Sequence, residues 1–229
     1  MDRACSLKSL MSTCKELYSD DILCELSPED SAEYKRLLER FHTVNNSVCK
    51  TTEKGKALED LVGFLIEKSG NIFEVVKNVK TGTNEIDEVI TLNETGKMLV
   101  GFKLLPERFE FVLGECKNYH TKVGVTYVGK FYSLLQTTAI TTGILFSYHG
   151  VTGKNWNDGS GLIKKIYLQR EDPDKRVAII DFSYEDFKRI ADGDNFLSII
   201  RKKLEALQLD TSIATSIAKH PAEKYFEKT

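Results

Sequence analysis

The chain lacks the cysteine and histidine patterns that are typical of disulfide frameworks and zinc sites. Its five cysteines are an odd number and include no C-x-x-C pair, so neither a disulfide framework nor a zinc ribbon is expected. The four histidines lie far apart and show no H-E-x-x-H spacing. We therefore expect reduced core thiols and no histidine-based metal site.

Long apolar segments and an excess of basic charge are also missing. No run of about 18 apolar residues occurs, so no membrane association is expected. Charged residues interrupt the apolar N-terminal residues and no small-residue cleavage site follows, which predicts no secretory signal and a cytoplasmic location. The net charge of −2 excludes a global basic field, but basic groups confined to one cleft remain compatible with nucleic-acid binding.

The composition is that of a globular protein with a full hydrophobic core. The chain has 229 residues, of which 41% are hydrophobic and 29% are charged. We divide it into an N-terminal helical segment (residues 1–50), an α/β core (51–182) and a C-terminal helical segment (183–229). In the first segment, apolar residues at helical spacing predict a helix near residues 7–18. Ser27, Pro28 and Asp30 indicate the start of a second helix.

Hydrophobic periodicity predicts the order of the remaining elements. A helix is expected at residues 54–68, with Glu59 at the margin of its buried face. The other predicted elements are strands at 72–80, 85–92, 98–104 and 109–117, turns at 81–84 and 93–96, a helix at 127–139, strands at 142–147 and 176–181, and helices at 183–190 and 195–207.

The segment that ends in Glu115, Cys116 and Lys117 is the most informative part of the chain. Side chains alternate along a strand, so Glu115 and Lys117 share one face and Cys116 points to the other. An acid in such an apolar strand is costly unless a metal or a cation compensates it. Asp87, in the middle of an earlier predicted strand, supplies a second carboxylate. Carboxylates without clustered His or Cys favour magnesium over zinc.

Plainer interpretations of these residues remain open. Asp87 could be a solvent-facing strand acid, like its neighbours Glu85 and Glu88, and Lys117 could simply end a strand at the surface. Glu59 could be a solvated acid at the boundary of its helix.

The order of these segments resembles the PD-(D/E)XK restriction-endonuclease-like superfamily, and within it most closely the Mrr-type restriction endonucleases. The resemblance covers about residues 54–180. It rests on the helix with Glu59, the strand at 70–76, the strand with Asp87, the triplet from Glu115 to Lys117, the helix after it and the strand at 142–147. No Pro precedes Asp87, which departs from a common feature of the superfamily. The implied fold is a mixed central sheet flanked by helices, with additional N- and C-terminal helices.

The resemblance also implies a function, namely metal-dependent cleavage of DNA in restriction or another defence against foreign DNA. Asp87, Glu115 and the backbone carbonyl of Cys116 would hold Mg²⁺, with Mn²⁺ as an alternative. Lys117 would orient the attacking hydroxide or stabilise the transition state, and Glu59 would hold metal-bound water. Rival hypotheses are a non-catalytic nucleic-acid-binding or scaffold protein on the same fold, in which the acids and lysine form a structural ion pair, an RNase, or a repair nuclease.

Four further residues are weaker candidates for contacts with DNA. Lys130 and Gln136 lie on the helix that follows the triplet, and Lys154 and Trp156 lie in a loop that borders the implied groove. Each could equally be an ordinary surface or core residue. The loop at residues 150–154 lacks the G-x-x-x-x-G-K-[ST] spacing, which excludes a nucleotide-hydrolase interpretation. DNA is the expected partner, and a homodimer or larger assembly through the terminal helices is an open alternative.

Overall fold

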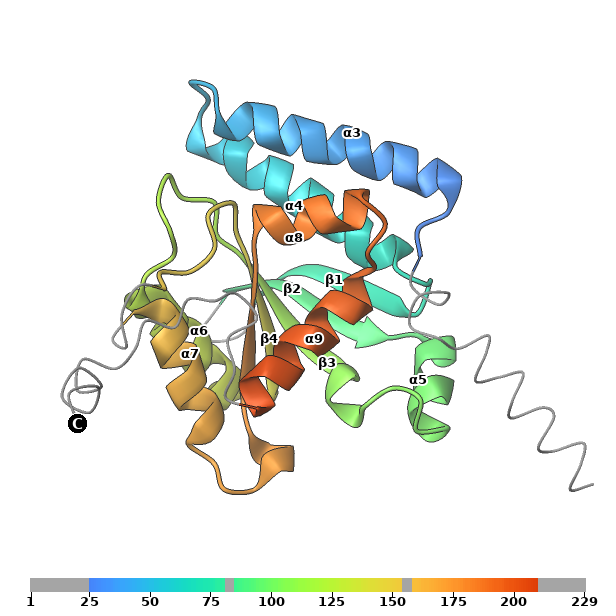
Figure 1. The fold of residues 1–229 in the computed structure, drawn as a ribbon, viewed down its shortest axis with the longest axis vertical. Coiled ribbons are helices and arrows are strands. Elements are labelled where there is room, and N and C mark those ends of the chain that lie inside the picture. Colours follow the sequence, from blue (N-terminus) through green and yellow to red (C-terminus); the bar gives the residue numbers. More distant parts are fainter. Residues whose placement is uncertain (1–24, 81–84, 154–157, 210–229) are drawn as a thin grey trace, which may run out of the picture.

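The computed structural model describes residues 25–80, 85–153 and 158–209, which form an α/β fold (Figure 1). Within these residues the helices are α3 (Pro28–Asn45), α4 (Thr51–Lys68), α5 (Glu94–Gly101), α6 (Val125–Thr138), α7 (Gly159–Leu168), α8 (Tyr184–Ala191) and α9 (Phe196–Gln208). The strands are β1 (Phe73–Lys80), β2 (Glu85–Leu92), β3 (Phe111–Cys116), β4 (Thr142–Phe146) and β5 (Ala178–Phe182). The helix predicted near residues 7–18 lies outside the described residues.

The five strands form one mixed sheet in the order β1-β2-β3-β4-β5. The first three strands pair antiparallel, and β3, β4 and β5 pair parallel. Parallel neighbours need a crossover connection, which α6 supplies between β3 and β4 and α7 supplies between β4 and β5. This topology confirms the predicted mixed central sheet.

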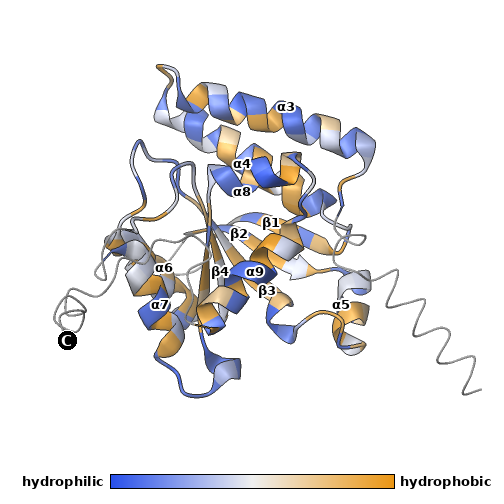
Figure 2. Cartoon of the chain, in the orientation of Figure 1, coloured by the Kyte–Doolittle hydropathy of each residue, from blue (hydrophilic) through white to orange (hydrophobic). Residues whose placement is uncertain are grey.

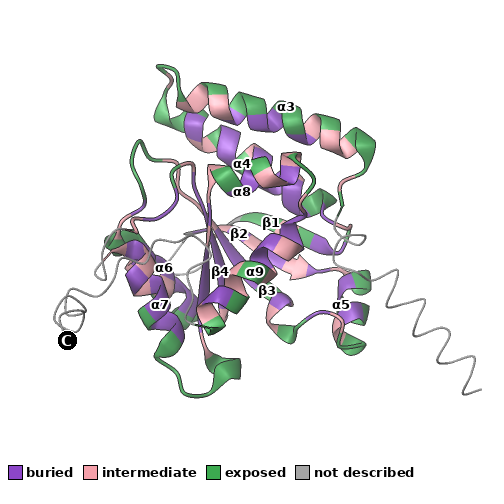
Figure 3. Cartoon of the chain, in the orientation of Figure 1, coloured by how far each residue is buried: buried purple, intermediate pink, exposed green. Residues whose placement is uncertain are grey.

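Helices cover both faces of the sheet, because side chains of the central strands alternate between two apolar clusters. Ile144 of β4 belongs to the cluster built with α3, α4, α8 and α9. Its neighbour Leu145 belongs to the second cluster, built with α6 and α7. All five residues of β4 are buried, as expected for a central strand (Figure 3). The predicted flanking helices are thus confirmed.

The start of α3 confirms the capping signal in the sequence. The Ser27 hydroxyl accepts a hydrogen bond from the Asp30 backbone N–H at 3.0 Å, and Pro28 occupies the first helical position. Along α3, apolar and polar residues alternate at helical spacing (Figure 2). The buried face includes Tyr34, whose hydroxyl donates to the Phe187 carbonyl at 2.8 Å and so ties α3 to α8.

Two predictions about local structure were wrong or incomplete. Residues 98–104 were predicted as a strand, but most of them lie in or directly after helix α5. The predicted turn at 93–96 is the start of that helix, because the Asn93 side chain accepts from the Gly96 N–H at 3.0 Å. Helix α7 was not predicted at all.

No helix in the described ranges is both long and apolar enough to span a membrane.

Candidate active site

The candidate site lies where β2 and β3 separate. Their antiparallel pairing ends at Glu88 opposite Gly114. At the preceding residue of β2, a side chain replaces the backbone as the partner of β3. Asp87 Oδ2 accepts a hydrogen bond from the Cys116 backbone N–H at 2.9 Å. The Asp87 carboxylate is therefore positioned by the backbone of the neighbouring strand.

Lys117 joins both predicted carboxylates. Its Nζ lies 2.6 Å from Glu115 Oε1 and 3.4 Å from Asp87 Oδ2. The backbone N–H of Lys117 donates to the Phe146 carbonyl at 2.8 Å, which fixes the segment to the end of β4. The side chains of Asp87, Glu115 and Lys117 are 26%, 17% and 24% exposed, so solvent reaches the group. We call these three residues the acid–lysine cluster.

The charges in this cluster depend on one another. Burial raises the pKa of Glu115, and the hydrogen bond from Lys117 opposes that change. Burial alone would lower the pKa of Lys117, but the carboxylates of Glu115 and Asp87 raise it above its ordinary value. Lys117 thus stays protonated at neutral pH. With both acids ionised, the cluster carries one net negative charge, which favours the approach of a further cation.

Glu59 is not brought into contact with the acid–lysine cluster. It is exposed on α4, and no hydrogen bond or ion pair joins its carboxylate to the cluster within the described residues. Its charge instead acts on the other face of β2 and β3, where it helps to raise the pKa of Glu88 and of the Cys116 thiol. The sequence analysis placed Glu59 at the margin of the buried face of its helix, and its catalytic role stays a prediction.

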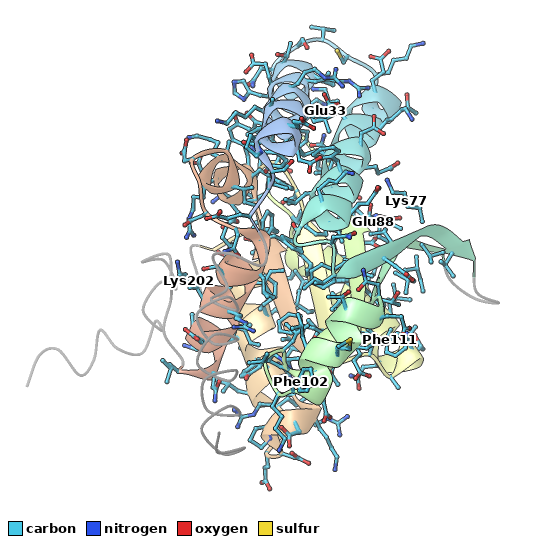
Figure 4. All side chains as sticks on the ribbon, turned by 90° about the vertical axis from the view of Figure 1, so that its right-hand side faces the viewer. Glu33, Lys77, Glu88, Phe102, Phe111 and Lys202 are labelled. Carbon is cyan, nitrogen blue, oxygen red and sulfur yellow. The ribbon has the colours of Figure 1, made fainter. Side chains whose placement is uncertain are left out.

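Glu88 is the titratable residue that the sequence analysis misjudged. It was grouped with solvent-facing strand acids, but it is 1% exposed, and neither carboxylate oxygen has a hydrogen-bond partner among the described residues. Burial raises its pKa to about 7, although the Lys77 ammonium works in the opposite direction. Lys77 lies opposite Glu88 in the pairing of β1 with β2, and both side chains lie beside α4 (Figure 4).

Two glycines make room for Glu88 and for Lys77. A Cβ on Gly63 of α4 would collide with the Lys77 ammonium and approach Glu88 Oε1. A Cβ on Gly114 of β3 would lie 3.1 Å from the Glu88 Cβ. Gly63 therefore leaves room for the Lys77 ammonium, and Gly114 leaves room for the Glu88 side chain. The alternation of side chains along a strand predicts that Glu88 and Asp87 point to opposite faces of the sheet. Only the packing of α4 shows that the face of Glu88 is covered.

Two of the four weaker candidates lie in the described part of the chain, and neither joins the cluster. Lys130 is exposed on α6, with its Nζ 5.4 Å from the centroid of the Tyr127 ring. Gln136 is exposed near the end of the same helix, where its Oε1 accepts from Arg170 at 3.4 Å. Lys154 and Trp156 lie outside the described residues, so their predicted contacts are not tested.

Two loops beside the cluster carry basic groups that the sequence analysis did not select. Residues 117–124 and 147–153 lie side by side (Figure 1), because Val123 N–H donates to the Gly150 carbonyl and Thr152 N–H donates to the Val123 carbonyl, each at 2.9 Å. Burial lowers the pKa of His149, and the nearby charges of His120, Lys122 and Lys54 lower it further. A group of basic residues therefore gathers on the two loops that follow β3 and β4.

A mixed five-stranded sheet flanked by helices is consistent with the restriction-endonuclease-like fold. Residues 51–169, more than half of the chain, match the Mrr catalytic-domain family model, which is described as "Restriction endonuclease". The chain belongs to this restriction endonuclease family, which confirms the resemblance identified from the sequence. No curated protein and no solved structure matches the chain.

Proposed function

We propose that the protein is a magnesium-dependent endonuclease that hydrolyses DNA phosphodiester bonds in restriction or another defence against foreign DNA. The observation that carries the proposal is the convergence of Asp87, Glu115 and Lys117 at the point where β2 and β3 separate. Membership of the restriction endonuclease family supports the nuclease class.

The donors at this point suit a hard divalent cation. Asp87, Glu115 and the backbone carbonyl of Cys116 would hold it, and all three supply oxygen. Both carboxylates already contact one cationic group, the Lys117 ammonium, so their oxygens are close enough to share positive charge. Within the described residues, no group of three His, Cys, Asp or Glu side chains could hold a metal. One or two carboxylates completed by water is the arrangement that Mg²⁺ commonly uses.

The ion, when bound, would supply Lewis acidity that neutralises charge on the phosphate and makes water easier to deprotonate. The chain's own residues do the remaining work. The Cys116 N–H donates to one oxygen of Asp87 and so holds this carboxylate against the end of β3. Lys117 stays protonated and can follow negative charge that develops on the attacked phosphate. Glu59 would support the site from its margin.

Substrate binding would use the basic loops. Lys122, His120 and His149 lie near one another on the two loops that follow β3 and β4. Phosphate contacts from Lys and Arg supply most of the sequence-independent affinity for DNA, so a local basic group suffices in a chain with net negative charge. We expect DNA affinity to fall steeply as salt concentration rises.

The proposal is tested with purified protein and supercoiled plasmid, linear duplex, single-stranded DNA and RNA. We expect cleavage of DNA with Mg²⁺, no cleavage with excess EDTA, and none by Glu115→Gln. The matched control is Glu74→Gln, which changes an exposed acid on β1 and should cleave like the parent. Equal cleavage by parent and Glu115→Gln would refute the site. DNA binding without cleavage by the parent would favour the scaffold hypothesis, and preferential cleavage of RNA would favour an RNase.

A further inference from the structure

Two tyrosines lie beside the acid–lysine cluster and share an exposed surface. Tyr119 follows Lys117 by two residues, and Tyr127 lies in the first turn of α6. Their ring centroids are 4.9 Å apart and the ring planes meet at 41°. The two residues are 36% and 37% exposed. Folding therefore brings the rings together and leaves much of their area accessible to solvent.

The core does not account for this pair. Neither Tyr119 nor Tyr127 belongs to the two apolar clusters that hold the sheet between its helices. The aromatic pair Phe146 and Phe182, by contrast, is fully buried within the first of these clusters. Aromatic rings that stay this exposed offer a large and rigid surface to a binding partner.

The electrostatic setting of the pair suits nucleic acid. The charges of Lys117 and Glu115 act on the Tyr119 phenol, which places the pair next to the cluster. Burial and the neighbouring Tyr127 raise the pKa of Tyr119 to about 12, so its hydroxyl stays neutral at physiological pH. Lys130, one turn further along α6, holds its ammonium 5.4 Å from the centroid of the Tyr127 ring. Aromatic faces with an adjacent cation are the combination that binds bases and phosphates of single strands.

We propose that Tyr119 and Tyr127 form a stacking surface for a nucleobase of the cleaved strand, and that Lys130 contacts an adjoining phosphate. Inside a duplex both faces of a base are covered by its neighbours, so a base must leave the stack before it can lie on a protein ring, and this costs least for an unpaired base. The preferred substrate is therefore DNA with an unpaired nucleotide next to the scissile bond, such as a single strand or a branched junction. This inference rests on the proposed nuclease function and adds its substrate class.

The test uses oligonucleotides that carry 2-aminopurine, a base whose fluorescence is quenched when it stacks. Binding to single-stranded and blunt duplex DNA is measured in Ca²⁺, which should support little turnover. The variants are Tyr127→Leu, which removes the ring, and Tyr127→Phe, which keeps it. The control is Val125→Ala, which changes an exposed residue in the same helical turn.

We expect the parent, Tyr127→Phe and Val125→Ala to bind the single strand and quench the probe alike. Tyr127→Leu should lose the quenching and bind the single strand roughly 5-fold to 100-fold more weakly, with little change for the blunt duplex. Equal weakening for both substrates would mean that the ring contacts the backbone of paired DNA, and it would overturn the inference, as would unchanged quenching.

A separate readout distinguishes this inference from the proposed function. If the parent quenches the probe in a Tyr127-dependent way but cleaves no DNA with Mg²⁺, the stacking surface stands and the hydrolytic function fails. If the parent cleaves DNA and Tyr127→Leu cleaves single-stranded, branched and duplex substrates at parent rates, the stacking surface fails and the hydrolytic function stands.

Discussion

Asp87 and Glu88 are neighbours on β2, and the fold gives them opposite environments. Asp87 is partly exposed, accepts the Cys116 N–H and lies 3.4 Å from the Lys117 ammonium. Glu88 is buried beside α4 without a hydrogen-bond partner among the described residues, and its pKa is raised to about 7. The strand alternation separates the two carboxylates, and packing decides that only Asp87 can meet a cation from solvent.

The same contrast extends to the lysines. Lys117 forms direct ion pairs with two carboxylates, whereas Lys77 influences Glu88 through space and donates to the Glu59 backbone carbonyl at 3.4 Å. Each face thus has one acid from β2 and one lysine. The arrangement with paired, solvent-accessible carboxylates is the one suited to bind an ion and a phosphate. The predictions below test whether the two faces differ in function as they differ in structure.

Exchange of the divalent ion should have the largest effect. We expect cleavage with Mg²⁺ or Mn²⁺, and a loss of at least roughly 1,000-fold when Ca²⁺ replaces them or EDTA is added, because several kcal/mol of charge stabilisation disappear. Ca²⁺ should still support DNA binding, since it can bridge carboxylates and phosphate but positions water poorly. Cleavage rates and filter binding measure the two effects. Robust cleavage in excess EDTA would contradict the prediction.

Replacement of Lys117 should come next. Lys117→Met keeps much of the side-chain volume and removes the charge, so the single-turnover cleavage rate should fall roughly 100-fold to 1,000-fold while DNA binding in Ca²⁺ changes little. Lys77→Met is the matched control on the other face, and its rate should stay within about threefold of the parent. If both variants lose the same activity, the distinction between the two lysines is wrong.

The stability of the protein should depend on pH through Glu88. Its pKa is raised from 4.5 to about 7, so between these values the folded protein binds more protons than the unfolded chain. Its contribution to stability is therefore greatest below pH 4.5 and is lost as pH rises to about 7. Glu88→Gln should raise the free energy of unfolding at pH 8 by about 1 to 3 kcal/mol and flatten this slope.

Urea unfolding at pH 5, 6, 7 and 8 in EDTA checks this prediction. The charges of Lys77 on β1, Asp87 and Glu59 on α4 act on Glu88, and among the described residues Lys77 is the one that lowers its pKa. Lys77→Met should therefore steepen the slope. The raised pKa of Glu115 adds a smaller slope of the same sign, which should persist in Glu88→Gln. The lowered pKa of His149 contributes a slope of opposite sign to both proteins, so the comparison of the parent with Glu88→Gln isolates Glu88. Equal slopes for the two proteins would contradict the assigned environment of Glu88.

The smallest effect should come from Glu59. Its carboxylate is exposed and makes no described contact with the acid–lysine cluster, so Glu59→Gln should lower the single-turnover rate by no more than about tenfold. A loss as deep as that of Lys117→Met would show that Glu59 reaches the reacting phosphate when DNA is bound. Exposed Glu53, on the first turn of the same helix, supplies the control Glu53→Gln.

Local signals in the sequence predicted much of the fold. Ser27 and Pro28 defined the start of α3, and the alternation around Glu115 placed that acid and Lys117 on one face. The region after Asn93 was harder, because the short apolar run from Met98 to Leu105 fits a strand or a helix equally well. The decisive feature is the Asn93 cap on the Gly96 N–H, a contact that became apparent only in the folded chain.

Other features depend on contacts between distant segments. Helix α7 begins with two glycines in its first three residues, Gly159 and Gly161, a composition more typical of loops, and it is stabilised by packing on α6 and β5. Glu88 looked like a surface acid because periodicity gives its face but not what covers that face. The pair Tyr119 and Tyr127 was missed for the same reason, since the loop before α6 brings the two rings together.

The most direct test of the central claim compares Asp87→Asn with Glu88→Gln. Each change replaces one of two adjacent carboxylates by its isosteric amide, and each is measured by single-turnover DNA cleavage with saturating protein and Mg²⁺ at pH 7.5. The structure predicts that Asp87→Asn loses cleavage, roughly 1,000-fold or more, while Glu88→Gln remains within about threefold of the parent. Equal rates for the two variants, or a deeper loss for Glu88→Gln, would contradict the assignment of the active face.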